Sequence, residues 1–176
     1  MTQGVTLDKN KAAVIIMDFQ NGIIGSGVED AEGVIKRAAS VLEGARSAGI
    51  PVMYVVHRGG RFETASAESE IHPGVAPKEG ERVISKTRAG AFSTTALDVT
   101  LREMGKDTLI LMGVVTSGCV LSTARWATDV NYKFWVISDG CADRDPEVHR
   151  ILTEKIYPRQ GTVVKAQEFL ATLGQG

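Results

Sequence analysis

Short apolar runs alternate along this chain with longer segments in which apolar residues recur at helical spacing. The run at residues 12–18 is continuously apolar and rich in β-branched residues, which is typical of a strand buried on both faces. Residues 30–48 then place apolar side chains three or four positions apart, which predicts a helix that ends at Gly49. The same alternation predicts strands at 51–57, 82–86, 108–115, 132–138 and 161–164, and helices at 94–104, 118–130, 145–156 and 166–173.

This alternation predicts the α/β class. Strands joined by helices form right-handed crossovers, so we expect a three-layer α/β/α Rossmann-like fold with a mostly parallel sheet of about six strands. The length of 176 residues favours a single domain spanning residues 1–176. In such open sheets ligands bind beyond the carboxyl ends of the strands, so the residues that end the strands are the candidates for function.

One segment interrupts the alternation. Residues 58–80 are rich in glycine and proline and poor in apolar residues. A loop of this length in a compact domain commonly serves as a lid, a binding loop or an interface element, and the sequence leaves these alternatives open.

Composition excludes several classes of partner. The formal net charge is −1 and no predicted helix carries a stripe of lysine and arginine, which argues against nucleic acid and anionic membranes as partners. Residues 1–11 are polar and lack the apolar stretch of a secretion signal, and no apolar run approaches the roughly 20 residues that span a bilayer. The two cysteines are therefore expected to be reduced thiols in a cytoplasmic protein.

Three reactive side chains end or follow predicted strands at one edge of the sheet. Asp18 closes the first strand, Lys86 closes the third, and Cys119 follows the fourth at the start of a helix. Each has an ordinary explanation by itself: a turn carboxylate, a solvated lysine and an inert buried cysteine. Together they supply the base and the cation that a cysteine nucleophile needs. The turn at residues 113–119 would add backbone N–H donors for an oxyanion.

The position of Cys119 leads to an expectation about its ionisation. The first turn of a helix and a nearby lysine ammonium both favour a thiolate, whereas the negative charge of Asp18 opposes it. We expect the pKa of Cys119 to lie below its ordinary value of about 8.5, with the proton shared between the thiol and Asp18. Cys141 is expected to be an inert buried thiol.

The segments around these residues read VIIMDFQNGI, VISKTRAGAFSTTALDVTLREMG and DTLILMGVVTSGCVLSTARWATDVNYKFWVISDGCAD. In them the chain resembles the isochorismatase-like cysteine hydrolases, which include nicotinamidases, N-carbamoylsarcosine amidohydrolases and ureidoacrylate amidohydrolases. The resemblance implies a catalytic triad of Asp18, Lys86 and Cys119, which we call the candidate triad. It also implies a cis peptide bond between Val114 and Val115, and an oxyanion hole formed by the N–H groups of Val115 and Cys119. The residues that it places at the substrate are Gln20, Phe92 and Thr116.

The chain departs from two branches of this family. Nicotinamidases carry a metal site with an Asp-x-His pattern after the second strand, where this chain reads YVVHRGGRFE. His57 and His72 alone are a poor ligand set for zinc, so we expect no metal and no other cofactor. True isochorismatases of this fold lack the cysteine nucleophile, which Cys119 supplies here.

We therefore expect a cysteine hydrolase that cleaves a C–N bond of a small amide, carbamoyl or ureido compound through a thioester acyl-enzyme. The alternatives are an isochorismatase-like ether hydrolase and a non-catalytic scaffold that retains the fold. The partners expected are a small-molecule substrate and further copies of the chain in a homo-oligomer. Trp126 is either an interface anchor or part of the core.

Overall fold

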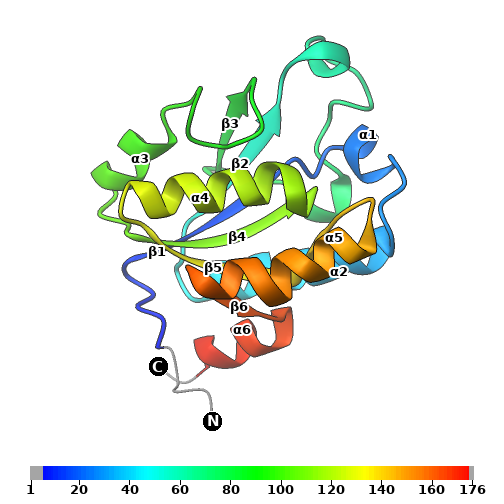
Figure 1. Cartoon of the computed structure of the whole chain (residues 1–176). Coiled ribbons are helices and arrows are strands. Elements are labelled where there is room, and N and C mark those ends of the chain that lie inside the picture. The colour runs from blue at the N-terminus through cyan, green and yellow to red at the C-terminus, as the bar shows by residue number, and fades with distance from the viewer. Residues whose placement is uncertain (1–5, 175–176) are drawn as a thin grey trace.

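A six-stranded sheet forms the centre of the computed structural model, which describes residues 6–174. The strand order is β3-β2-β1-β4-β5-β6 and every neighbouring pair is parallel (Figure 1). The predicted α/β fold is confirmed, with a sheet that is parallel throughout. The strands are β1 (Ala12–Met17), β2 (Val52–His57), β3 (Arg82–Lys86), β4 (Thr108–Val114), β5 (Lys133–Ala142) and β6 (Thr162–Val164).

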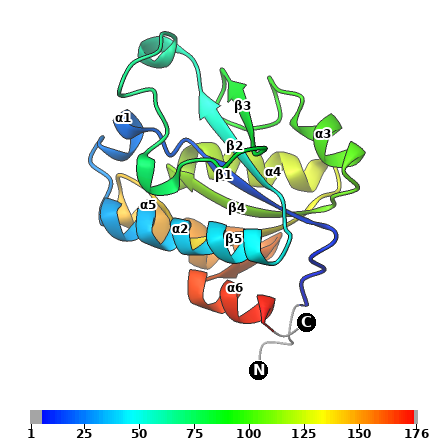
Figure 2. The same cartoon turned by 180° about the vertical axis from the view of Figure 1, so that it is seen from behind.

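Helices cover both faces of this sheet. Figure 1 shows α4 (Leu121–Asp129) and α5 (Pro146–Ile151) in front of it, with α3 (Leu97–Glu103) at the edge near β3. Figure 2 shows α2 (Ala31–Ser47) and α6 (Ala166–Leu173) on the opposite face. No helix within residues 6–174 is both long and apolar enough to cross a membrane.

Strand β1 illustrates why the apolar runs become central strands. All of its residues are buried, with Val14 and Ile16 in the core beneath α2 and Ile15 and Met17 in the core beneath α4. Full burial of one such side chain stabilises the fold by about 1.5–3 kcal/mol. A strand that buries both faces must therefore be apolar at every position, which is the pattern of residues 12–17.

Several boundaries differ from the sequence predictions. Strand β5 continues past Ser138 to Ala142, because a register irregularity between Leu111 and Gly113 lets it resume pairing with β4. The helix predicted at 118–130 begins earlier, as a π-helical turn at Thr116–Val120 that leads into α4. The helix predicted at 145–156 is α5 followed by a second π-helical turn, Leu152–Ile156.

The glycine-rich loop at 58–80 packs over the segment that follows β1. This segment forms the short helix α1 (Asn21–Ile24), which the sequence pattern did not predict. The loop carbonyls of Glu68 and Glu70 accept hydrogen bonds from the N–H groups of Gly22 and Asn21, at 2.9 and 3.0 Å. The loop therefore lies beside the carboxyl edge of the sheet, where β1 ends.

Candidate active site

The carboxyl edge of the sheet brings the candidate triad together. Lys86 Nζ lies 2.7 Å from Asp18 Oδ2, and these two side chains are 2% and 8% exposed. Lys86 Nζ also donates to the carbonyl of Arg88 at 3.1 Å. Cys119 is buried next to them, 3% exposed, and its thiol interacts with the Asp18 carboxyl. Strand ends far apart in the sequence thus deliver a carboxylate, an ammonium and a thiol to one buried cluster.

Asp18 sits at an unusual backbone position. Its φ of 59° lies in the left-handed region, which aspartate tolerates better than most residues with a side chain. Its N–H still donates to Val55 O at 2.8 Å, so the residue is fixed to β2 while the chain turns away from β1. The left-handed turn therefore ends the strand at the carboxylate.

One oxygen of Asp18 is free to accept a proton. Oδ1 is buried and has no hydrogen-bond partner among residues 6–174, whereas Oδ2 is held by Lys86. A buried carboxylate oxygen without a donor is costly, so such positions in folded proteins call for an explanation. A base that takes a proton from a neighbouring thiol would have this geometry.

The ionisation of the triad differs from the sequence expectation. Burial raises the pKa of Asp18, and the Lys86 ammonium partly opposes that shift. Burial, followed by the charge of Asp18, raises the pKa of Cys119 well above its ordinary value, with Lys86 again opposing. The expectation of a depressed thiol pKa was wrong, because loss of hydration outweighs the stabilisation that Lys86 provides. The raised pKa favours the neutral thiol form of Cys119 beside the Asp18 carboxyl.

Gly113 leaves the space that the Cys119 sulfur occupies. A Cβ at position 113 would lie 2.9 Å from Cys119 Sγ and 2.8 Å from Val120 Cγ2. These distances are shorter than real Cβ contacts, so a side chain there would push the sulfur away. The glycine on β4 thus sets how closely the thiol approaches the sheet.

Gly113→Ala is expected to impair turnover about a hundredfold, because a displacement of the thiol on the order of 1 Å costs about that much. Overpacking should also lower the free energy of unfolding by about 1–3 kcal/mol. Gly140→Ala is the matched control, since its added Cβ would press on Met112 Sδ at 3.0 Å and away from Cys119. Equal activity in the two variants, measured with urea denaturation alongside, would contradict this role for Gly113.

Two of the expected backbone features can be located. The Val114–Val115 peptide bond is cis. The π-helical turn that follows carries Thr116 at its first position and Cys119 near its end. Val115 and Cys119 therefore flank one tight turn at the carboxyl end of β4.

The residues assigned to the substrate make contacts within the protein. Gln20 is fully buried: its Oε1 accepts from His57 N at 2.7 Å and its Nε2 donates to the carbonyls of His57 and Ser69. These bonds hold the 58–80 loop against β1 and β2 and leave no exposed group for a ligand. The assignment of Gln20 to the substrate stays a prediction.

Phe92 and Thr116 also make contacts within the protein, and their assignment to the substrate stays a prediction. The Phe92 ring packs on Tyr132 with centroids 5.7 Å apart, and Tyr132 directly precedes β5 at the opposite edge of the sheet. Thr116 is fully buried; its Oγ1 lies 2.8 Å from His149 Nδ1, and its carbonyl accepts from the Tyr157 hydroxyl at 2.7 Å. Both side chains are occupied by protein contacts.

The sequence pattern did not predict the groups that hold the Cys119 turn. Asp143 Oδ2 accepts from Ser117 N at 2.7 Å, and His149 and Tyr157 contact Thr116. Asp143 follows β5 directly, so the strand-end rule could have found it if the strand had been predicted at its full length. His149 and Tyr157 carry no such signal, because they reach the turn from a later segment.

Within residues 6–174 no group of three or more histidine, cysteine, aspartate or glutamate side chains could hold a metal ion. His57 is half-buried, and burial together with Lys86 lowers its pKa. His72 Nδ1 accepts from Gly74 N at 3.0 Å, so this nitrogen already serves as a helix cap. The expectation of a metal-free protein remains a prediction.

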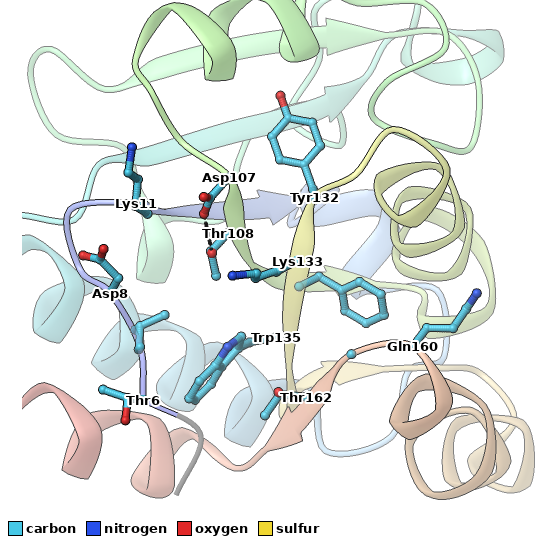
Figure 3. A pocket seen from close by; sticks show the side chains of 13 residues that line it. Thr6, Asp8, Lys11, Asp107, Thr108, Tyr132, Lys133, Trp135, Gln160 and Thr162 are labelled. Atoms are coloured by element: carbon cyan, nitrogen blue, oxygen red, sulfur yellow. Dashed lines mark hydrogen bonds between the residues drawn. The ribbon is translucent and has the colours of Figure 1, made fainter.

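Cavities lie at both edges of the sheet. One of about 490 Å³ is lined by residues that precede or begin β1, β4, β5 and β6, including Lys11, Asp107 and Thr162 (Figure 3). It is at the amino edge, opposite the candidate triad. A second, of about 240 Å³, lies at the carboxyl edge between α2 and α5, and His149 and Cys141 are among its lining residues. The second cavity therefore borders the elements that hold the Cys119 turn.

Comparison with known proteins identifies the family. The isochorismatase domain family matches residues 12–168. The chain belongs to the isochorismatase family. The resemblance found in the sequence is thus confirmed, and the protein is an isochorismatase-family hydrolase.

Individual relatives of this isochorismatase-family chain cover nearly its whole length. It is 31% identical to the secreted isochorismatase effector Isc1 of Verticillium dahliae, over 93% of this chain and 92% of that protein. It is 30% identical to the maleamate amidohydrolase of Pseudomonas putida, over 93% of this chain and 87% of that protein. The solved structure of N-carbamoylsarcosine amidase from Thermoplasma acidophilum superposes with a TM-score of 0.78 at 29% identity, covering 89% of this chain and 96% of that one.

Proposed function

We propose that this protein hydrolyses a C–N bond of a small amide, carbamoyl or ureido compound, with Cys119 as the nucleophile. The observation that carries the proposal is the buried, unpartnered Oδ1 of Asp18, whose sister oxygen is fixed by Lys86. The pKa of Asp18 is raised by burial, which makes the carboxylate a stronger base for a thiol proton. The similarity to a maleamate amidohydrolase and an N-carbamoylsarcosine amidase supports amide chemistry.

In the first half of the reaction Asp18 accepts the thiol proton as the sulfur attacks the carbonyl carbon. The N–H groups of Val115 and Cys119 are the donors that the proposal assigns to the oxyanion, each worth about 3–4 kcal/mol of barrier. The C–N bond then breaks, and Asp18 returns the proton to the leaving nitrogen. Ammonia or an amine departs and a thioester remains on Cys119.

In the second half a water molecule attacks the thioester. Asp18, again a carboxylate, takes a proton from this water, and the C–S bond breaks. The proton passes to the departing sulfur, so the free thiol and the carboxylate are restored along with an acid product. Throughout the cycle Lys86 orients Asp18 through its 2.7 Å contact.

A screen of small amides, carbamoyl compounds and ureas for ammonia release tests this proposal. Acid quenching during turnover should trap an adduct on the peptide that contains Cys119, visible by mass spectrometry. Hydrolysis of a vinyl ether that survives alkylation of Cys119 would instead support the ether hydrolase, which the similarity to the isochorismatase effector keeps as the second candidate. No turnover together with an inert thiol would point to a scaffold.

Dialysis against a strong chelator is expected to leave activity unchanged. The reason is chemical: a thiol nucleophile with a carboxylate base and an ammonium needs no Lewis acid to attack an amide carbonyl. Activity assayed before and after dialysis, with metal content measured by mass spectrometry, decides the matter. Loss of activity that zinc or iron restores would contradict the prediction.

The proposal includes a cytoplasmic homo-oligomer. Trp126 on α4 is 46% exposed, so it is not a core residue, and it is free to serve as the interface anchor. Light scattering should give a mass of at least twice 18.8 kDa. Trp126→Ala is expected to weaken association, with Val99→Ala on α3, 57% exposed, as the control. A monomer mass across a wide concentration range would refute the oligomer.

A further inference from the structure

Thr116 is fixed from two sides by residues that follow β5. The Tyr157 hydroxyl donates to the Thr116 carbonyl at 2.7 Å, and His149 Nδ1 lies 2.8 Å from Thr116 Oγ1. Thr116 is the first residue of the π-helical turn Thr116–Val120, which carries Cys119. The two contacts therefore act on the start of the turn that presents the nucleophile.

The Tyr157 hydroxyl is suited to hold a carbonyl in place. Burial raises its pKa well above the ordinary value for tyrosine, so it remains a proton donor over the whole working pH range. The ring packs edge-on against Phe134 with centroids 6.5 Å apart, and the residue is only 1% exposed. The ring position is thus set by the core and does not depend on the hydroxyl.

The Thr116 carbonyl does not need Tyr157 in order to form the turn. It also accepts from the N–H of Leu121, the residue that follows the turn. Removal of the hydroxyl leaves that backbone bond in place, so the helix should form but with its first residue less constrained. Cys119 Sγ has only a weak contact of its own within the turn, 3.6 Å from Val115 O. The position of the sulfur consequently follows the position of the turn.

We propose that Tyr157 and His149 are positioning residues, which hold Thr116 so that Cys119 Sγ stays beside the free oxygen of Asp18. The expected effect of these contacts on catalysis rests on the proposed function, whereas their effect on the position of the Cys119 sulfur does not. Reactive groups must be held within a fraction of an ångström, so a looser turn lowers the rate without changing how the substrate binds. The effect belongs to kcat rather than to KM.

Tyr157→Phe tests the proposal, with Tyr132→Phe as the matched control. Tyr132 is also a buried residue and its hydroxyl donates to Asp98 Oδ1 at 2.9 Å, but at the opposite edge of the sheet. Tyr157→Phe is expected to lower kcat about tenfold with KM within about twofold of wild type. Tyr132→Phe should leave both constants unchanged. A fall in kcat of the same size in both variants, or in neither, would overturn the proposal.

Alkylation of Cys119 provides a readout that does not require a substrate. The thiol is influenced by Asp18, Lys86 and Cys141, and the charge of Asp18 opposes its ionisation. A thiol that moves away from Asp18 should ionise more easily, so Tyr157→Phe should shift the pH midpoint of iodoacetamide alkylation downward. Mass spectrometry of the peptide containing Cys119 separates this reaction from that of Cys141.

The two proposals can fail separately. An unchanged alkylation midpoint in Tyr157→Phe would refute the positioning role even if amide hydrolysis is found. A shifted midpoint without ammonia release from any compound would refute the function and leave the positioning role standing. If Tyr157→Phe does not fold, His149→Ala breaks the other contact with Thr116 and should produce the same downward shift; an unchanged midpoint there would overturn the proposal.

Discussion

Cys119→Ala is expected to lower turnover about a thousandfold or more, because the variant lacks the thiol that the proposal makes the nucleophile. Cys141→Ala is the matched control. Both cysteines are buried, at 3% and 2% exposure, so both variants open a similar small cavity. Of the two thiols, only Cys119 has its pKa raised by the charge of Asp18. Retention of more than a few per cent of activity by pure Cys119→Ala protein would refute the thiol mechanism.

Asp18→Asn should separate ionisation of the thiol from catalysis. The amide has the shape of the carboxylate but cannot accept the thiol proton, so turnover should fall about as far as in Cys119→Ala. The charge of Asp18 helps to hold the pKa of Cys119 above its ordinary value. Its removal should therefore speed alkylation of Cys119 while turnover is lost. Slower alkylation in this variant would contradict the assigned electrostatics.

Lys86→Met is expected to have a large effect on both stability and activity. It leaves the Asp18 carboxylate buried without its cation, and breaking a buried ion pair in this way typically costs about 3–5 kcal/mol. The pKa of Asp18 should rise further, because the Lys86 ammonium that lowers it is gone, so less of the carboxyl is ionised and able to act as a base. Urea denaturation and ammonia release measure the two losses.

Lys78→Met is the control for this experiment. Lys78 pairs with Glu43 at 2.8 Å, but the two side chains are 57% and 61% exposed. An exposed pair contributes at most about 1 kcal/mol, so this variant should resemble wild type. If the two lysine substitutions lowered the free energy of unfolding equally, burial of the Lys86–Asp18 pair would not explain the destabilisation by Lys86→Met.

The loss in free energy of unfolding caused by Lys86→Met should be smaller at low pH than at high pH. Burial raises the pKa of Asp18 in the folded state above its unfolded value, so the folded state binds this proton more tightly. Stability contributed by that proton is present at low pH and is lost as the pH rises through the folded pKa. The variant, with its still higher pKa, should therefore be closer to wild type at about pH 5 than at about pH 8. The opposite trend in urea midpoints would contradict the assignment.

The sequence by itself determined the order of the elements and the residues of the candidate triad. Strand β1 must be apolar at every position because it is covered on both faces, and Asp18 is recognisable as the carboxylate that ends this run. Parallel strands place their carboxyl ends at one edge, so the proximity of Asp18, Lys86 and Cys119 followed from the alternation of strands and helices.

Only the tertiary structure decided what surrounds those residues. Hydrophobic periodicity reports which face of an element is buried, but not which distant polar group a buried side chain meets. The bonds of Gln20 to His57, and of Thr116 to His149 and Tyr157, join segments 33 to 41 residues apart along the chain. The raised pKa of Cys119 has the same origin, because the loss of hydration depends on everything packed around the sulfur, whereas the helix position visible in the sequence is one local contribution.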